Sequence, residues 1–559
     1  MKALVIALTT ISITTIATAQ TQTQSQNNEN ISGGYESFSE WYQNDFKTGS
    51  SFTPSDARFL SNHYFKADYT LGRFAAGAQY EAYLPAPLLG YFPGLKGNAL
   101  ATYYGSFKVD QLEATAGYFY DQFGSGLVFR SWEDRQLGTN NAIKGVRVKL
   151  QPTSFLAVTA LSGYQRVGFE TSKGQINGLN SELDLGNLFD FADLGIRFGG
   201  SYVGRYIPPS GSEPSTVNAY SGRFNLDYGG LSLGAEYVAK GKDLRPDFSG
   251  SGINYYDPGS ALLGTIGYAK QGFGLTAQYR RLENMGFYSD TDPNIVNNPF
   301  NSQVINYLPA LTKQHDYNVT NLYRYSSHGN MVFNQGVFGE NGGQVDVFFN
   351  LPKGSSLGGR FGTKVALNYA VWYGLGAKID TANNKYTINK EFGTKYFQDA
   401  NIEIKKKWSQ NWSSIFSYIN IFYNATVPGL SAAQQGATGL INANIFAVES
   451  THRWNTRAST RLLLEHLSTA DDLKSWASAT LEQGFSSHYS MYVTDLYNYG
   501  NPDPTQRIHY YTIGASYMQG PTRIALTYGR QRGGLICSGG VCRYVPPNTG
   551  LNITISTTF

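Results

Sequence analysis

Apolar and polar residues alternate with a period of two along most of this chain. In 112–120 the even positions carry Leu, Ala, Ala, Tyr and Tyr, whereas the odd positions up to 117 carry Glu, Thr and Gly. The same alternation recurs in 144–150 and 231–240. It predicts β-strands with one apolar and one polar face, because successive side chains of a strand point to opposite sides.

The alternating segments predict one continuous β-structure rather than several domains. They follow one another from Ile31 onward, with no linker and no stretch of convincing helical periodicity. Charges keep to the polar face, and a charge on a lipid face would cost ~2–4 kcal/mol at the membrane centre, which favours a membrane barrel over a soluble sandwich. We therefore predict an all-β fold: a transmembrane antiparallel β-barrel of about 24 strands, within a range of about 20 to 24, with long surface loops.

Short and long connections alternate between the predicted strands, as expected for periplasmic turns and surface loops. Gly, Pro and Asn mark short hairpin connections at 71–72, 110–111, 152–153, 229–230, 271–272, 353–356, 409–411 and 519–521. Longer polar or aromatic connections are predicted near 86–97, 123–140, 165–174, 207–214, 244–258, 288–340, 374–395, 425–439 and 534–549.

The two ends of the chain predict export to the cell outer membrane. Residues 1–19 carry one Lys, an apolar core and a final Ala-Thr-Ala, which is typical of a cleaved signal peptide. Residues 20–30 are mostly Gln, Thr, Asn and Ser and predict a flexible leader, so 31–559 is the predicted barrel. The ending at Phe559 resembles the closing strand of bacterial outer-membrane proteins, which implies outer-membrane lipid and the outer-membrane assembly machinery as partners.

Composition agrees with a barrel and argues against several other classes. Gly and Tyr are abundant, charged residues make up only 15%, and the net charge is +4, so no nucleic-acid partner is indicated. The chain has no Gly-x-Ser-x-Gly motif, and its seven His residues have no close metal-ligand spacing. Ser289–Pro293 and Asp471-Asp472 carry oxygen ligands suited to calcium, but such acidic pairs are more often solvated loops. We predict no catalytic residue, no cofactor and no metal site.

A wall of this size encloses a wide lumen, and barrels with roughly 22 strands are normally plugged. Residues 123–135 place four charges beside Trp132, and 288–340 forms a second long connection. We hypothesise that at least the first folds inward as a plug and pairs with charges on the lumen face. The alternative is a solvated surface loop. The plug candidates are Arg130, Glu133, Asp134 and Arg135, and the lumen candidates are Arg147, Glu236 and Lys240.

The two cysteines form the sharpest local feature. Cys537 and Cys542 enclose Ser-Gly-Gly-Val between the last two predicted strands. Export places them in an oxidising compartment, so we predict a disulfide that holds the shape of a surface hairpin. A redox enzyme is not favoured, because the spacing is not Cys-x-x-Cys.

Several longer runs resemble a Bacteroidota outer-membrane β-barrel family of unknown function. The resemblance covers essentially the whole mature chain and lies in Gly117–Leu127, Glu133–Gly138, Arg280–Met285, Ser490–Tyr499 and Cys537–Pro546. It implies an outer-membrane location and a porin-like barrel. It implies no activity, because the family has none established.

Two functions from different classes follow from these patterns. The first is a porin-like or solute-transport channel, favoured by charges on the lumen face. The alternative is a non-conducting scaffold or partner subunit of an envelope assembly or secretion machine, favoured by the long loops and a filled interior. A barrel hydrolase is a third hypothesis, because catalytic triads assemble in space and leave no fixed spacing in the sequence.

Overall fold

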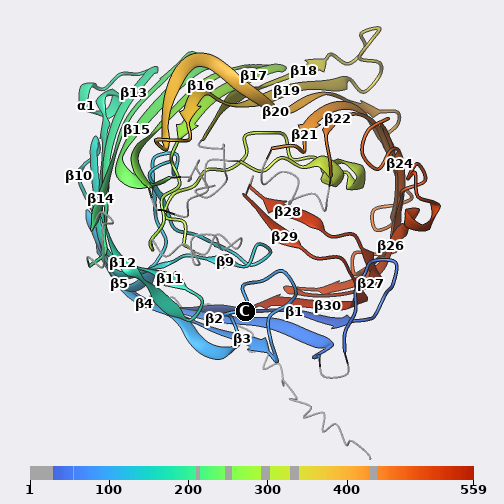
Figure 1. The fold of residues 1–559 in the computed structure, drawn as a ribbon, viewed down its shortest axis with the longest axis horizontal. Helices are drawn as coiled ribbons and strands as arrows, with labels where there is room; N and C mark the ends of the chain where they lie inside the picture. The colour runs from blue at the N-terminus through green and yellow to red at the C-terminus, as the bar shows by residue number, and fades with distance from the viewer. Residues whose placement is uncertain are drawn as a thin grey trace, which may run out of the picture.

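The computed structural model describes residues 29–53, 56–208, 215–245, 253, 255–290, 303–327, 339–427, 437–539 and 541–559. Within these residues, 24 strands form one antiparallel sheet that closes on itself (Figure 1). Strand β1 (Glu29–Tyr42) pairs with β2 (Phe59–Leu71) on one side and with the last strand, β30 (Asn548–Thr558), on the other. The predicted fold class and strand number are therefore confirmed. The predicted signal peptide, and the leader up to residue 28, lie outside the described residues.

The other barrel strands follow in chain order, each paired with its sequence neighbour in the wall. They are β3 (Phe74–Leu84), β4 (Gly97–Val109), β5 (Leu112–Phe119), β10 (Ile143–Thr153), β11 (Leu156–Val167), β12 (Glu170–Asp184), β13 (Leu194–Tyr206), β14 (Thr216–Tyr228), β15 (Leu231–Arg245), β16 (Tyr255–Lys270), β17 (Phe273–Glu283), β18 (Gly339–Leu351), β19 (Thr363–Asp380), β20 (Lys385–Lys407), β21 (Trp412–Asn424), β22 (Leu440–Arg453), β23 (Ser459–Ser468), β24 (Trp476–Gly484), β25 (Tyr489–Tyr497), β26 (His509–Gln519) and β27 (Thr522–Gln531).

The alternation along each strand sorts side chains between the outside and the lumen. On β10, Val146 is 53% exposed on the outer surface, whereas the neighbouring Arg147 pairs with lumen carboxylates. Large apolar side chains are exposed in this way on strand after strand, and a belt of that extent does not face water in a soluble protein. The outer face is therefore the lipid-facing surface of a transmembrane barrel.

Helical structure is sparse in the described part of the chain. It comprises α1 (Leu185–Phe189) in one turn and two short 3-10 helices, η1 (Asn318–Tyr323) and η2 (Pro504–Gln506). None of the described helices has the length and apolar character needed to cross a membrane.

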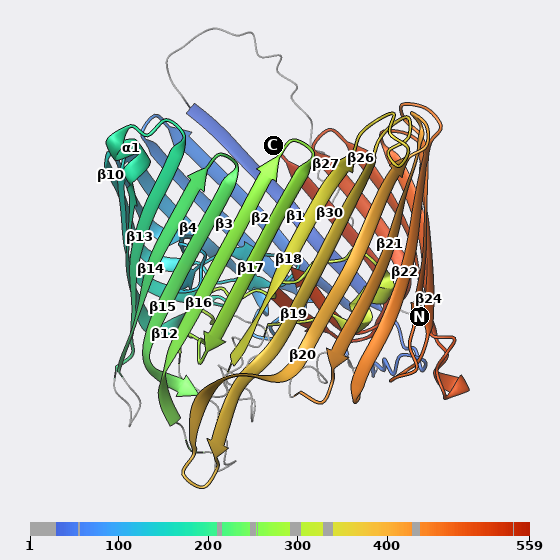
Figure 2. The same ribbon diagram turned by 90° about the horizontal axis from the view of Figure 1, so that it is seen from above.

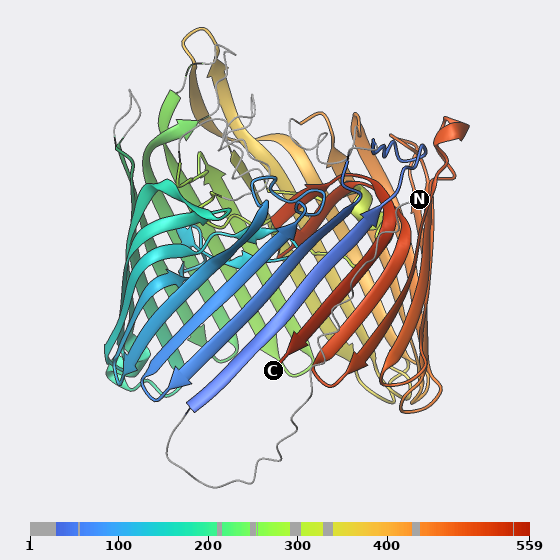
Figure 3. The same cartoon turned by 90° about the horizontal axis from the view of Figure 1, so that it is seen from below.

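The two ends of the barrel differ in the length of their connections (Figure 2). At the turn end, two-residue connections join β4 to β5, β14 to β15 and β16 to β17, at the positions that the sequence predicts. The C-terminus lies at this end, and Glu29 pairs there with Leu71. The loop end carries the longer connections, as Figure 3 also shows.

Two predicted long connections are wrong. Residues 165–174 hold only a tight turn between β11 and β12, and the predicted 374–395 connection is largely strand, because β19 reaches Asp380 and β20 starts at Lys385. Both strands of the second hairpin project past the rim of the barrel (Figure 2). Beyond the membrane, polar side chains are accepted on both faces of a strand. The alternation that identifies the spanning part therefore fades there, although the pairing continues.

Three connections at the loop end turn into the barrel, and we call them the inner segments. They are residues 120–142, residues 284–290 with 303–327, and residues 532–539 with 541–547, and all three cross the interior in Figure 1. Short strands stiffen two of them: β6 (Gln122–Phe123), β7 (Phe129–Arg130), β8 (Glu133–Asp134) and β9 (Thr139–Asn140) in the first, and β28 (Gly534–Ser538) and β29 (Val541–Val545) in the third.

Apolar side chains on the lumen wall explain why these segments fold inward. Phe123, Phe129 and Phe287 are buried in a cluster with wall residues of β10 to β17, such as Ile176 and Val238. A second cluster packs the 310–325 stretch against wall residues of β19 to β25. Exposed to water, these inner-wall patches would be unfavourable, so covering them supplies the main driving force for the inward fold.

Substitutions of two adjacent residues of β27 test which side chains face lipid and which face the lumen. Leu526 is 45% exposed on the outer surface, and Leu526→Arg should lower the free energy of unfolding by about 2–4 kcal/mol because it places a guanidinium in hydrocarbon. The control is Thr527→Arg on the lumen face, where the register sets Thr527 opposite Gly514 and Asn552. It should cost much less. Urea unfolding in lipid vesicles measures both, and equal losses would contradict the assignment of faces.

Candidate functional site in the barrel interior

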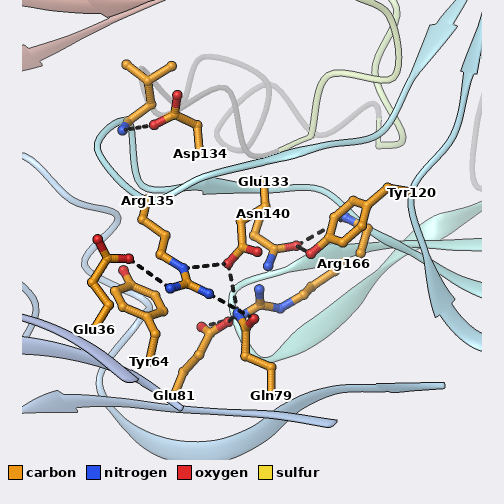
Figure 4. Close-up of polar contacts among 12 residues, drawn as sticks. Glu36, Tyr64, Gln79, Glu81, Tyr120, Glu133, Asp134, Arg135, Asn140 and Arg166 are labelled. Carbon is orange, nitrogen blue, oxygen red and sulfur yellow. Dashed lines mark hydrogen bonds and ion pairs between the residues drawn. The ribbon is translucent and has the colours of Figure 1, made fainter. Parts of the chain in front are cut away.

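Arg135 fastens the first inner segment to the barrel wall (Figure 4). Its Nη1 lies 2.8 Å from Glu36 Oε2 on β1, and its Nη2 donates to Gln79 Oε1 on β3 at 3.2 Å. Its Nε pairs with Glu133 Oε1 at 3.3 Å, and the guanidinium lies 4.7 Å from the centre of the Tyr64 ring. Burial by itself would lower the pKa of Arg135, but Glu133 and Glu36 outweigh it and raise that pKa.

A buried ion pair next to Arg135 connects two strands of the wall across the lumen. Arg166 Nη2 on β11 lies 2.6 Å from Glu81 Oε2 on β3, although three strands separate β3 from β11 in the wall. The two side chains are 2% and 1% exposed. Gln79 donates to both Glu81, at 2.9 Å, and Glu133, at 2.8 Å, and so joins this ion pair to the inner segment (Figure 4).

The other two charges predicted in the first segment have different surroundings. The Arg130 guanidinium lies 3.9 Å from the Tyr307 ring centre and 5.0 Å from that of Trp132, so it joins the first segment to the second. Asp134 acts locally, because its Oδ1 accepts a hydrogen bond from Leu137 N at 2.9 Å. The sequence thus predicts all four residues in one segment but not the distinct partner of each.

The predicted lumen charges do contact the inner segments, through other residues than we expected. Arg147 pairs with Glu113 at 2.6 Å and with Asp121, at the start of the first segment, at 3.4 Å. Glu236 Oε2 accepts from Ser125 N at 3.0 Å. Lys240 pairs with Asp243 at 3.3 Å and donates to the carbonyl of Gly286 in the second segment.

We expected the segment 123–135 to pair with lumen charges such as these three, and Ser125 does bond to Glu236, but the charges of 130–135 have other partners. Arg135 and Glu133 bond to the wall near β1 and β3 instead. The physical reason is the path of the segment, which starts beside β10 and turns toward the other side of the lumen before reaching Glu133. The 121–125 stretch therefore meets Arg147 through the Asp121 carboxylate and Glu236 through the backbone N–H of Ser125.

The second inner segment has its own polar anchors, which the sequence analysis missed. Glu340 on β18 accepts from Tyr325 OH at 2.5 Å and Ser327 Oγ at 2.8 Å, and it pairs with Arg280 at 2.7 Å. Farther along, His315 Nε2 lies 2.7 Å from Asp399 Oδ2. The alternation of faces could have identified these wall residues, because it places Arg280, Glu340 and Asp399 on the lumen side of their strands.

A backbone contact also holds this segment to the wall. Val319 N, at the start of η1, donates to Glu465 Oε2 on β23 at 3.0 Å, and Asn318 Nδ2 donates to Ser478 Oγ at 3.1 Å. Arg205 Nη1 donates to the carbonyl of Tyr288 at 2.9 Å and pairs with Asp243. The second segment is therefore attached on opposite sides of the lumen.

The third inner segment is the cysteine hairpin. Cys537 and Cys542 are disulfide-bonded directly across β28 and β29, with Cα atoms 4.0 Å apart. We expected a surface hairpin, and that placement is wrong, since the hairpin lies inside the barrel (Figure 1). Arg543 Nε donates to Gln136 O in the first segment at 2.7 Å, and Tyr307 OH donates to Gly539 O. These contacts give the hairpin partners that only the assembled interior provides.

The carboxylates considered for calcium have protein partners where they are described. Asp471 Oδ2 accepts from Asn442 N at 2.9 Å and Asp472 Oδ2 from Tyr323 OH at 3.1 Å. Residues 291–293 of the other stretch lie outside the described residues. Among the residues that the structure does describe, no group of His, Cys, Asp and Glu is arranged to hold a metal ion.

Similarity to known proteins is distant. No curated protein matches the sequence. Solved structures with similar folds include the siderophore receptor PirA from Pseudomonas aeruginosa, at 10% identity and a TM-score of 0.42, covering 96% of this chain and 81% of that one. OccK8 (OprE) from Pseudomonas aeruginosa matches at 9% identity and a TM-score of 0.36, with 95% and 98% covered. A BenF-like porin from Pseudomonas fluorescens matches at 11% and 0.34, with 79% and 99% covered.

A match to a known family spans the whole sequence. The family is described as a family of unknown function, DUF6029, and the match covers residues 1–559. The chain therefore belongs to the DUF6029 family.

Proposed function

We propose that this protein is a gated solute channel of the cell outer membrane. In this proposal the three inner segments close the lumen at the loop end and part to let a solute through. The observation that carries it is that the short strands of these segments form separate two-stranded sheets inside the barrel, held to the wall by apolar packing and by polar contacts such as those of Arg135, Lys240 and Glu340. Such contacts can be exchanged without breaking the sheet.

The shape of the remaining lumen supports a channel. A cavity of ≈ 610 Å³ lies between the first inner segment and the turn end of the barrel. It is bounded by Ser125 and by polar wall residues such as Glu182, Arg197 and Asn225. An aqueous route needs polar walls of this kind, whereas a barrel that served only as a scaffold has no need of them. The lumen is thus filled near the loop end, and near the turn end it holds a cavity with charged and polar wall residues.

The C-terminus supports the proposed location and assembly route. Phe559 N donates to Gly33 O at 3.0 Å, and Gly33 N donates back to Phe559 O at 2.9 Å, so the last residue seals the closing seam. The Phe559 ring is 62% exposed and stacks on Phe65 at 6.2 Å. An accessible terminal aromatic carboxylate at this seam is suited to recognition by the outer-membrane assembly machinery.

The alternative, a scaffold in an envelope machine, is favoured by one feature. The hairpin of β19 and β20 projects beyond the rim (Figure 3), and it exposes Phe392 at 60% and Ile379 at 40%. Apolar side chains held above the membrane can bind a partner protein of the envelope. This function is compatible with a closed lumen, and conductance separates it from the channel.

Deleting residues 125–138 tests the gate directly. The deletion removes Arg135 and Glu133 with most of the first inner segment, so single-channel conductance in a planar bilayer should rise well above that of the wild type. Heat-modifiable migration on a gel checks that the barrel still folds. Unchanged conductance in a folded barrel would contradict a gating role for this segment.

A single substitution tests the contribution of Arg135 alone, without removing the segment. Arg135→Ala removes the bonds to Glu36, Gln79 and Glu133, and the loss of charge-assisted hydrogen bonds worth about 1.5–3 kcal/mol should raise the open probability by about tenfold or more. The matched control is Arg197→Ala. Arg197 pairs with Asp227 at 2.5 Å in the lumen, with side chains 51% and 49% exposed. The same rise in both variants would show that Arg135 has no special role.

A further inference from the structure

We propose that the turn-end mouth of the lumen binds a small solute that carries at least two negatively charged groups, phosphate or carboxylate. The site is a cavity of ≈ 610 Å³ between β18 and β22, closed below by the connections 352–362 and 408–411. Cavities of roughly 300–1,000 Å³ are typical of small-molecule sites. Transport of that solute would rest on the proposed channel function, whereas its binding would not.

The strand register places two lysines side by side on the lumen face of this mouth. Lys364 on β19 lies directly opposite Lys405 on β20. Lys405 shares its face with Glu403, which pairs with Lys313 of the second inner segment, so both lysines face the lumen. Like charges directly opposite each other destabilise a sheet. A polar pair would be the more stable choice here, so two facing lysines indicate a function other than stability.

The cavity has no free carboxylate to balance these cations. Glu449 is the acidic residue of its lining, and it lies 2.8 Å from Arg461, whereas Glu403 is engaged by Lys313 at 3.4 Å. Among the ion pairs of the described residues, none involves Lys364, Lys405 or Arg453, and all three side chains are exposed. The positive charge is therefore uncompensated and accessible from the lumen.

A neighbouring lysine keeps the cavity in shape. Lys406 points to the other side of the strand, and its Nζ donates to Gly358 O at 2.9 Å and to Thr363 Oγ1 at 2.7 Å. These bonds hold the 352–362 connection under the mouth, where Lys407 lies 5.6 Å from the Phe361 ring centre. Lys406 thus holds the floor, Lys407 lies against it, and Lys405 faces the space above it.

The face of the wall on which these cations lie indicates which kind of anion binds. Lysines that anchor a barrel to lipid headgroups lie on its outer face, whereas Lys364, Lys405 and Arg453 are exposed on the lumen face. The ligand is therefore a dissolved anion rather than a lipid. Separate cations at Lys364–Lys405 and at Arg453 favour two anionic groups in one molecule over a single one.

Binding to the purified full-length protein tests this inference. Isothermal titration with pyrophosphate and, separately, with citrate should show saturable binding that weakens as salt rises. Tighter binding of pyrophosphate would identify phosphate as the preferred group, and tighter binding of citrate would identify carboxylate. Lys405→Glu should weaken binding by about tenfold or more, because it removes a charge-assisted hydrogen bond and adds a repelling carboxylate. Lys405→Arg should retain most of it.

Lys108→Glu is the control for net charge. Lys108 is exposed near the same end of the barrel, but it lies opposite Glu113 and outside this cavity. An equal loss in Lys108→Glu and Lys405→Glu, or no saturable binding of either ligand to the wild type, would overturn the proposal. Binding by a protein that conducts nothing in a bilayer would support the anion site and contradict the channel, so the two failures are distinguishable.

Discussion

A closed wall of 24 strands encloses more space than its own side chains can fill, and the rest of the structure depends on how that space is occupied. Water alone would leave apolar wall residues such as Ile176 and Trp372 hydrated. The chain solves this by turning three of its own connections inward, so that Phe123, Phe287 and their neighbours cover the wall. The inner segments are thus part of the core, and the barrel has an interior that resembles that of a soluble protein.

Apolar packing and ion pairs contribute differently to this interior. Burial of a large apolar side chain is worth about 1.5–3 kcal/mol, and the two main clusters contain many of them. A buried ion pair roughly breaks even on formation, yet breaking it by removing one partner costs about 3–5 kcal/mol. Arg166–Glu81 and Arg280–Glu340 therefore fix which segment lies where, while the apolar clusters supply most of the stability.

The wall could be predicted from the sequence because one rule, the alternation of faces, acts on every spanning residue. It places Arg147 and Glu236 in the lumen and locates turns such as 229–230. The interior could not be predicted in the same way. Whether Arg135 meets Glu36 or Glu236 depends on the path of a connection across the lumen, and no local pattern encodes that path. The cysteine hairpin shows the same limit, since its bond follows from spacing and compartment but its inward direction does not.

The two ends of the lumen differ in electrostatic character, and this difference follows from where the inner segments bind. At the loop end, carboxylates such as Glu340 and Asp399 are buried and are each met by a hydroxyl or an imidazole of an inner segment, and Glu340 also pairs with Arg280 of the wall. None of the inner segments lines the turn-end cavity, and there Lys364 and Lys405 have water as their surroundings. A solute anion drawn to that cavity would sit below a barrier that apolar packing and polar contacts hold in the lumen, apart from the barrel sheet. Attraction at one end and closure at the other is the arrangement that a gated route for anions requires, and one sheet builds both because its inner segments do not line the turn-end cavity.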